Sequence, residues 1–471
     1  MNNFDYILLE NFLKENIDFL KNSRIQKIQQ PTRTELIFSV RNLGETRKFY
    51  ININPNMFHI CFMSKENEEK RFIKIPQKPP MFCMLLRKYL ESSLIAKIVQ
   101  PQGERILEFY FETYDETDEK IYLCLAIELM GKHSNIILYN YDTNMIIGCA
   151  HNVGTDKSRE RELFGGLPYC YPPKAQKKDF KGLSSIFKTT DINSQIDDYF
   201  ANLQYEKTIK NLKSKIFQIT NQKQKHITQT ISKIKRQINP KEKTENYRKL
   251  GDLIMSNLYN NEDYSKNIEI FDYETNQTIK INLDETKTLK ENANRYYKLY
   301  TKGKTALEKT TQMIQELELE KINIEQILYS IEECNTYNKL KEIEEEILPN
   351  QKAEKIKPSK IDEQIIDNFK IYIGKNNKQN DYIVSKLARP NDLWFHIHNC
   401  AGSHILLRLE AGQKENDKII FECAKLAKKY SIAKNSSKVG IIYTKAKNLK
   451  KPPKANLGYV IYQNEQEIII D

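Results

Sequence analysis

The first third of the chain mixes helical and extended spacings of apolar residues. Residues 4–20 repeat apolar side chains every three or four positions, as a helix does. The stretch 79–100 opens with prolines and continues as a basic amphipathic pattern, which predicts a second helix. Alternating runs predict strands at 34–40, 48–53, 57–63, 105–114, 120–129, 134–140 and 145–150. Residues 1–176 are therefore predicted to form one α/β domain that ends in a Gly- and Pro-containing stretch.

The middle of the chain carries long helical repeats of opposite charge. Between residues 207 and 238 there are nine Lys or Arg and no Asp or Glu, whereas 308–346 holds eleven Glu against four Lys. The first segment has a heptad-like apolar stripe: Ile209, Leu212, Ile216, Ile219, then Ile227, Ile231, Ile234 and Ile238. A basic helix followed by an acidic one predicts an antiparallel coiled-coil arm over 207–348, with a small α/β tip at about 239–290.

Two interpretations of the charges on this arm remain open. The opposite charges neutralise each other across the two helices, or the outward lysines form a stripe that meets phosphate. A projecting arm buries little surface for its length, so its usual purpose is reach toward a large partner.

Residues 361–471 are predicted to form a compact α/β module. The pattern gives a strand at 369–374, a helix at 379–389 and a strand pair at 393–398 and 403–410. A strongly amphipathic helix covers 416–434, and three further strands end the chain. The whole is a multidomain α+β protein, with a linker at 177–206.

Length and charge narrow the class of protein. A chain of 471 residues suggests about two to four domains. Lys plus Arg (74) exceeds Asp plus Glu (62), giving a net charge of +12, which favours nucleic acid or an anionic membrane as partner. The alternative is a solvated surface in a lysine-rich proteome.

Several classes find no support in the pattern. No run reaches the ~18 apolar residues of a membrane span, and acids interrupt the apolar N-terminus, so we expect no secretory signal and a cytoplasmic protein. The eight cysteines form no CxxC pair, so we expect no structural metal and no disulfide framework. Catalytic signatures such as GxSxG, HExxH or a Rossmann fingerprint are absent. A binding protein without cofactor, rather than an enzyme, is the expectation.

The C-terminal module carries the densest set of candidate RNA-binding side chains. Amide and ammonium donors follow Gly374, and aromatic and imidazole groups follow on the next strand and turn; such donors and ring faces suit phosphates and unstacked bases. The candidates are Lys375, Asn376, Asn377, Lys378, Asn380, Trp394, His396, His398 and His404. Alternatively, Trp394 belongs to the core. A metal on the three histidines is disfavoured because no carboxylate or cysteine has matching spacing.

A second candidate in this module is a lysine-rich loop. Lys445, Lys447, Lys450, Lys451 and Lys454 fall within ten residues around the Pro452-Pro453 pair, with no acid among them. A proline-stiffened basic loop between strands can clamp phosphate. A merely solvated loop has the same composition.

The N-terminal domain has two candidate sites of its own. After Gly131, the turn Lys132-His133-Ser134-Asn135 offers donors for an anion, although it is not a P-loop. Glu104 and Arg105 place a carboxylate and a guanidinium at the start of a strand. The second pair is also explained as an ordinary surface ion pair.

These motifs resemble those of one known family. MGKHSNIIL (130–138) resembles the signature of the NFACT N-terminal domain, and residues 373–407 and 424–462 resemble the NFACT RNA-binding domain. Residues 245–260 and 291–309 are similar to the coiled-coil segment of that family. The resemblance therefore runs nearly end to end.

For the N-terminal domain, the resemblance implies a formamidopyrimidine-glycosylase-like fold that holds tRNA. The Asp-Arg pair that the family needs for tRNA recruitment falls on Glu104 and Arg105, with glutamate in place of aspartate. Asp5 matches an early aspartate with the same suspected role. In the 177–206 linker, where relatives carry a helix–hairpin–helix unit, this chain has only a short stretch.

For the whole chain, the resemblance implies ribosome-associated quality control. Such proteins bind a large ribosomal subunit blocked by peptidyl-tRNA and recruit tRNA, mainly that for alanine, for mRNA-independent tailing of the nascent chain. The ribosome makes the peptide bonds, and the resemblance also implies a small S4-like RNA-binding helper protein. The alternatives are a general RNA- or ribosome-binding scaffold, a surface fibronectin-binding adhesin and a glycosylase-like DNA repair enzyme. An adhesin would need an export signal, and a glycosylase would need a catalytic N-terminal proline. The sequence shows neither feature.

Overall fold

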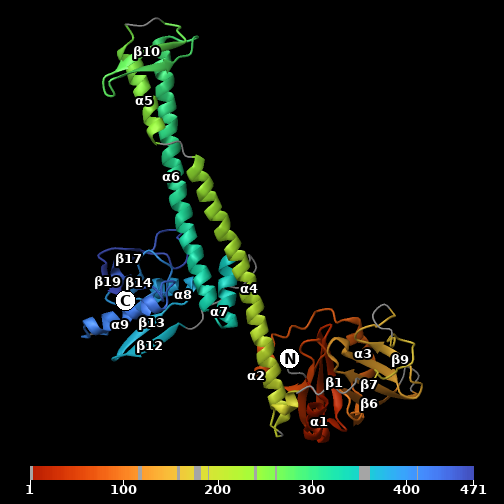
Figure 1. Cartoon of the computed structure of the whole chain (residues 1–471). Coiled ribbons are helices and arrows are strands. Elements are labelled where there is room, and N and C mark those ends of the chain that lie inside the picture. Colours follow the sequence, from red (N-terminus) through yellow and green to blue (C-terminus); the bar gives the residue numbers. More distant parts are fainter. Residues whose placement is uncertain are drawn as a thin grey trace. The chain divides into compact units, whose positions relative to one another are not determined.

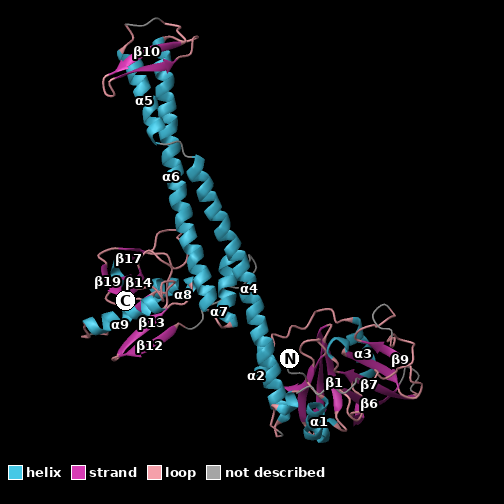
Figure 2. Cartoon of the chain, viewed as in Figure 1, coloured by secondary structure: helices cyan, strands magenta, loops and turns pink. Residues whose placement is uncertain are grey.

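The computed structural model divides into two compact units, residues 1–208 and 209–471 (Figure 1). Figure 2 distinguishes the strand-rich parts from the long helices. No helix in the described part of the chain is long and apolar enough to cross a membrane. The structure describes residues 4–114, 119–155, 160–173, 182–188, 190–237, 241–259, 263–348, 361–410, 412–453 and 455–471.

The first unit is built on a nine-stranded antiparallel sheet. Its strand order is β4-β3-β2-β1-β5-β6-β7-β8-β9, so chain neighbours are mostly sheet neighbours. The strands are β1 (Arg24–Thr32), β2 (Glu35–Asn42), β3 (Glu45–Asn52), β4 (His59–Met63), β5 (Leu94–Val99), β6 (Ile106–Tyr114), β7 (Lys120–Glu128), β8 (Asn135–Asn140) and β9 (Ile146–Cys149).

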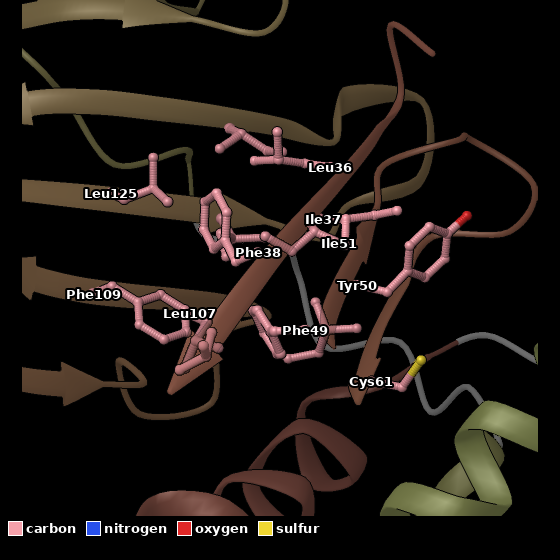
Figure 3. Close-up of a cluster of buried hydrophobic side chains, with 14 of the residues drawn as sticks. Leu36, Ile37, Phe38, Phe49, Tyr50, Ile51, Cys61, Leu107, Phe109 and Leu125 are labelled. Carbon is pink, nitrogen blue, oxygen red and sulfur yellow. The ribbon is translucent and has the colours of Figure 1, made fainter. Parts of the chain in front are cut away.

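Helices cover one face of this sheet. They are α1 (Tyr6–Leu20), α3 (Met81–Leu90) and the first turns of α4 (Ile192–Gln237), while the short α2 (Lys65–Lys70) contacts the start of α4. Short 3-10 turns η1 (Gly131–His133) and η2 (Leu183–Ser185) complete the unit. The core between helices and sheet is rich in phenylalanine: the Phe49 and Phe109 rings lie 5.6 Å apart, and Phe38 lies beside them (Figure 3). Burial of such side chains contributes roughly 2–3 kcal/mol each.

Two strands of this sheet correct the sequence prediction. Strand β1 was not predicted, and β5 was predicted as the end of a helix. In each, the buried isoleucines are three residues apart, Ile25 with Ile28 and Ile95 with Ile98, which imitates helical spacing. A register shift lies within each strand and brings both side chains to the core face, as a β-bulge does.

The start of α4 is anchored in the first unit by a buried ion pair. Arg71 Nη1 donates to Asp197 Oδ1 at 2.6 Å, and both side chains are almost fully buried. The other Asp197 oxygen accepts from the Ser64 backbone N–H at 2.9 Å and from Asn67 at 2.8 Å. The carboxylate is thus fully hydrogen-bonded, as a buried charge requires. Of the predicted 177–206 linker, 177–181 and 189 lie outside the described residues.

In the second unit, α4 and α6 (Leu289–Glu333) pack side by side in opposite directions. Ile227 and Ile231 of α4 pack on Ile324 of α6, which confirms this part of the predicted apolar stripe, whereas Ile238 lies outside the described residues. Farther along, Lys235 pairs with Glu318 at 3.0 Å. Part of the opposite charge is therefore neutralised between the helices.

The acidic segment is two helices rather than one. Helix α6 ends at Cys334, where the backbone becomes extended, and α7 (Tyr337–Ile347) begins after Thr336. The apolar side of α7 packs against α4 at the base of the arm; the buried members of this cluster are Leu212, Ile216, Ile327, Ile331, Cys334, Leu340, Ile343 and Ile347. The prediction of one continuous helix to residue 346 was wrong.

The tip of the arm has a core of its own. It consists of α5 (Lys241–Ser256), the hairpin β10 (Asn267–Asp272) and β11 (Gln277–Asn282), and the start of α6. Thr288 and Glu291 form a capping box that begins α6. The buried residues here are Ile254, Ile268, Ile270, Ile281, Leu283, Leu289 and Ala293.

The C-terminal module is a six-stranded antiparallel sheet of order β12-β13-β15-β14-β16-β19. Helix α9 (Asp417–Lys429) packs on one face. The other face is covered by α8 (Asn377–Tyr382), the π-helical turn η3 (Ile383–Leu387) and a two-stranded ribbon. The strands are β12 (Asp362–Ile366), β13 (Phe369–Ile373), β14 (Leu393–Ile397), β15 (Ile405–Leu407), β16 (Val439–Lys445), β17 (Leu449–Lys450), β18 (Ile461–Tyr462) and β19 (Gln466–Ile470), with a 3-10 turn η4 (Ala446–Asn448).

Candidate nucleic-acid interfaces

The structure brings both N-terminal motifs to the same edge of the large sheet. Arg105 directly precedes β6, and Gly131 lies just after β7, the antiparallel neighbour of β6. Phe58 lies between them: its ring is 5.5 Å from the Arg105 guanidinium carbon, and a Cβ on Gly131 would be 3.7 Å from the ring. The buried Phe58 ring therefore supports both Arg105 and the turn from beneath, and brings the cation and the turn to one place.

Arg105 is partly buried beside carboxylates. Burial lowers the pKa of the Arg105 guanidinium, and the charges of Asp5 and Glu104 oppose that change. Arginine remains charged at neutral pH because its ordinary pKa is far higher. The residue thus offers a fixed positive charge next to two acids.

Both carboxylate oxygens of Asp5 accept hydrogen bonds from backbone N–H groups of the protein. Its Oδ1 accepts from the Leu8 backbone N–H at 2.9 Å and caps α1, while Oδ2 accepts from the Ser184 N–H at 2.9 Å. An ideal Cβ at Gly182 would lie only 1.8 Å from Oδ2, so a side chain there would displace the carboxylate. The supporting residues Gly182 and Ser184 carried no signal in the sequence, because they are distant from Asp5 along the chain.

The 131–135 turn divides into exposed and structural positions. Lys132 and His133 are exposed. Ser134 and Asn135 are buried: the Ser134 hydroxyl accepts from the Met130 N–H at 2.8 Å, and the Asn135 amide donates to the His151 carbonyl at 2.8 Å. Of the four predicted anion donors, only the first two are presented at the surface.

The glycine turn of the C-terminal module is occupied by protein. Asn376 donates to Glu342 at 3.0 Å, Asn377 donates to Glu346 at 2.8 Å, and Lys378 pairs with Glu345 at 2.8 Å. All three acids belong to α7, so the acidic side of this helix holds the module. In addition, Lys375 pairs with Asp362, and Asn380 Oδ1 accepts from the His404 N–H.

This docking corrects the expectation that the turn presents its donors at the surface. Asn376, Asn377 and Asn380 are each about 2% exposed. The sequence pattern could not predict this burial, because a turn rich in hydrogen-bond donors is equally suited to phosphate and to a row of carboxylates. The acids of α7 are the complementary partner here.

Trp394 lies in the core between sheet and covering ribbon. It is 1% exposed and is packed against His396 at 5.6 Å, His404 at 5.1 Å and Tyr462 at 5.8 Å between ring centroids. A base has no access to the indole face in this arrangement, which corrects the predicted surface position. The alternative of a core tryptophan agrees with the structure.

The three histidines of this strand and turn differ in environment. Burial lowers the pKa of His396 to about 4, and it lowers the pKa of His404 well below its ordinary value, with the neighbouring His396 adding to the effect. Both are therefore neutral at physiological pH. His398 is exposed, with its Nδ1 3.0 Å from Glu467 Oε1. Within the described ranges, no three His, Cys, Asp or Glu side chains are arranged to hold a metal ion.

The lysine loop does present free charge. Lys445, Lys447, Lys450 and Lys451 are all exposed, and Lys451 also pairs with Asp381 at the end of α8. Gly458 N–H also donates to Asp381 Oδ1 at 3.2 Å, which fixes the loop against α8. All four of these lysines thus face solvent on a loop held against α8, and Lys451 alone among them is paired with an acid; Lys454 lies outside the described residues.

Comparison with known proteins covers almost the entire chain. The model for the NFACT N-terminal and middle domains matches residues 5–191 and 184–362, and that for the NFACT protein RNA-binding domain matches residues 364–463. The protein named Rqc2 homolog RqcH from Streptococcus pneumoniae is 26% identical over an alignment of 544 positions, which covers 99% of this chain and 97% of that protein. The Bacillus subtilis protein of the same name is 25% identical over 569 residues, with the same coverage.

Among solved structures, the N-terminal part of a fibronectin/fibrinogen-binding protein from Streptococcus suis is 32% identical and covers 37% of this chain and 62% of that one, with a TM-score of 0.34. Because the family models together span far more than half of the residues, from the N-terminal sheet through the arm to the C-terminal module, the chain belongs to the NFACT family.

Proposed function

We propose that this protein acts in ribosome-associated quality control. In this proposal it binds a large ribosomal subunit that carries peptidyl-tRNA, and it recruits tRNA, that for alanine, for mRNA-independent tailing of the nascent chain. The observation that carries the proposal is the match to proteins named RqcH over 99% of this chain and 97% of theirs. The similarity runs from one end of the chain to the other, which supports proposing for it a role that uses both terminal domains and the arm.

The N-terminal surface is the proposed tRNA contact. Arg105 supplies a fixed positive charge over the Phe58 ring, and Lys132 and His133 are exposed on the adjacent turn. Cations placed in this way suit tRNA phosphates. We also propose a formamidopyrimidine-glycosylase-like fold for this unit and a coiled-coil role for the arm.

In this proposal the protein is not an enzyme. It binds and positions tRNA and ribosome, and the ribosome's own peptidyl-transferase centre makes the peptide bonds. A small S4-like RNA-binding helper and a cytoplasmic site of action belong to the same proposal. The exposed lysines of the C-terminal loop, Lys445, Lys447 and Lys450, contribute contacts to ribosomal RNA phosphates.

The test is purification of the protein from growing cells, followed by sequencing of the RNA that accompanies it. We expect large-subunit ribosomal RNA and one dominant tRNA, with little small-subunit RNA. Large-subunit RNA without enriched tRNA would support the scaffold alternative. Absence of ribosomal RNA would refute the proposal.

A further inference from the structure

The face of the C-terminal module that lies over Trp394 carries exposed aromatic rings among free lysines. Tyr382, at the end of α8, is 39% exposed, and Tyr459, just before β18, is 40% exposed. Lys386 of the π-helical turn and Lys450 of β17 are exposed as well. We name these four residues the tyrosine–lysine face.

Contacts show that the two segments carrying this face lie side by side. A Cβ added to Gly458 would be 3.0 Å from Asn380 Cβ, so the chain before Tyr459 passes directly over α8. The Asp381 carboxylate accepts from the Gly458 N–H, next to Tyr459. Both tyrosines therefore flank one fixed junction.

The alternation along the covering ribbon decides which side chains point outward. Val460 and Tyr462 pack inward toward Trp394, together with Leu449. Tyr459 and Ile461 alternate with them and are exposed, and Ile461 is paired with Lys450 across the ribbon. A ring, an aliphatic side chain and an ammonium group are thus held outward by a packed ribbon.

The positive charges of Lys386 and Lys450 on this face are not neutralised by neighbouring acids in the described part of the chain. Asp381, the acid at the junction, is already paired with Lys451. Within the described part of the chain, Lys386 and Lys450 have no ion-pair partner. Lys447 is exposed on the same loop, and its backbone N–H donates to the Pro390 carbonyl near the end of the turn that bears Lys386.

We propose that the tyrosine–lysine face binds single-stranded RNA, with bases stacked on Tyr382 and Tyr459 and phosphates beside Lys386 and Lys450. Exposed rings set among cations are the arrangement that stacks unpaired bases while meeting the backbone. A duplex keeps its bases paired and cannot use the rings in this way. The inference rests on the proposed RNA-binding function and names its surface and the class of RNA.

This assignment also accounts for the occupied glycine turn. The donors of 375–378 meet the acids of α7 and Asp362, so RNA contact by the module needs another surface. The tyrosine–lysine face lies on the same side of the sheet as α8 but uses residues that do not engage α7.

The experiment measures binding of the full-length protein to a fluorescein-labelled oligouridylate and to a labelled RNA duplex, by fluorescence anisotropy over a series of salt concentrations. We expect Tyr382→Ala with Tyr459→Ala to weaken oligouridylate binding at least tenfold, since stacking on one ring contributes about fivefold or more. The salt dependence of that binding stays unchanged because no charge is removed.

Matched variants separate stacking from charge and from misfolding. Tyr382→Phe with Tyr459→Phe keeps both rings, so its affinity should stay within about twofold of wild type. Lys386→Gln with Lys450→Gln should instead lower the salt slope, by roughly 0.7 for each lysine that meets a phosphate.

Wild-type affinity in the alanine pair, or an equal loss for duplex RNA, would overturn the inference, as would failure of the wild type to bind oligouridylate. Such results leave ribosome copurification, the test of the proposed function, unaffected. Conversely, if no ribosomal RNA accompanies the protein purified from cells, the proposed function fails. The oligouridylate affinities of these variants still test the inference.

Discussion

Asn376 donates a hydrogen bond from its side-chain amide to Oε2 of Glu342 over 3.0 Å, and each residue is no more than 2% exposed. This contact joins the RNA-binding module to α7, whose opposite side packs on α4 and α6. A buried carboxylate is tolerated only when it is hydrogen-bonded, so the pair ties the position of the module to the base of the arm.

The ion pair beside this contact gives a first prediction. Lys378 and Glu345 lie 2.8 Å apart and are about a quarter exposed. Lys378→Glu should lower the free energy of unfolding by about 1 kcal/mol, because two carboxylates then face each other. Adding Glu345→Lys should restore at least half of the loss, as measured by urea denaturation.

The control for this cycle is Lys414→Glu, which reverses an exposed lysine of the same module. Its stability should stay within about 0.5 kcal/mol of wild type. Simple additivity of the two single variants in the double variant would contradict an energetic coupling of α7 with the module.

The partly buried His396 predicts a pH dependence of stability. Its folded pKa is about 4, below the ordinary value of 6.5, so the unfolded chain binds the extra proton over this range. The free energy of unfolding should therefore fall as pH decreases from about 6.5 to 4, by roughly 3 kcal/mol from this residue. Above pH 6.5 its contribution is constant.

His396→Gln should flatten that part of the stability curve relative to wild type. His404 lies 5.2 Å away between ring centroids and retains its own acid sensitivity, so some slope remains. Urea denaturation at several pH values measures the difference. Parallel curves for the two proteins would show that the fold does not lower the pKa of His396.

The N-terminal surface predicts separate losses of tRNA and ribosome. Glu104→Arg with Arg105→Glu moves the positive charge away from Phe58 while keeping the net charge. We expect tRNA to disappear from the purified complex and the large subunit to remain. RNA sequencing of the purified material measures both.

A charge exchange elsewhere on the same sheet is the control. Glu112 and Lys120 pair at 2.8 Å on β6 and β7, and both are nearly half exposed. Exchanging them should leave tRNA recovery as in wild type. Normal tRNA recovery with the Glu104–Arg105 exchange would refute the site assignment.

The lysine loop predicts unequal effects of similar substitutions. Neutralising Lys445, Lys447 and Lys450 to glutamine should flatten the salt dependence of RNA binding, by about 0.7–0.9 for each phosphate that no longer meets an ammonium group. Lys451→Gln should change that slope little, because Asp381 already takes its charge. Equal slopes for the triple variant and wild type would assign the three lysines to solvent alone.

Sequence patterns predicted the arm and the module well where one periodicity dominates. The stripe through Ile227 and Ile231 is the packed side of α4 because an uninterrupted helix preserves its spacing. Strands β1 and β5 were not predicted as strands, because a bulge breaks the two-residue alternation on which strand prediction depends.

The candidate sites show the same division. Lys445, Lys447 and Lys450 are exposed as a basic loop suggests, since charged side chains are rarely buried without a partner. The burial of Asn376 and Asn377 was not predictable, because their partners on α7 are separated from them by many residues. Local composition shows which donors and charges a segment carries, and only the fold shows which groups they bind.

The separate core of the tip has a consequence for local unfolding of the arm. Ile254, Ile270 and Ile281 pack with one another and not with the clusters at the base of the arm. Cooperative opening follows such boundaries, so backbone amides of β10 and β11 should exchange with deuterium through a local event that leaves α7 closed. The arm would then have a distal end that reshapes against a partner while its base stays intact.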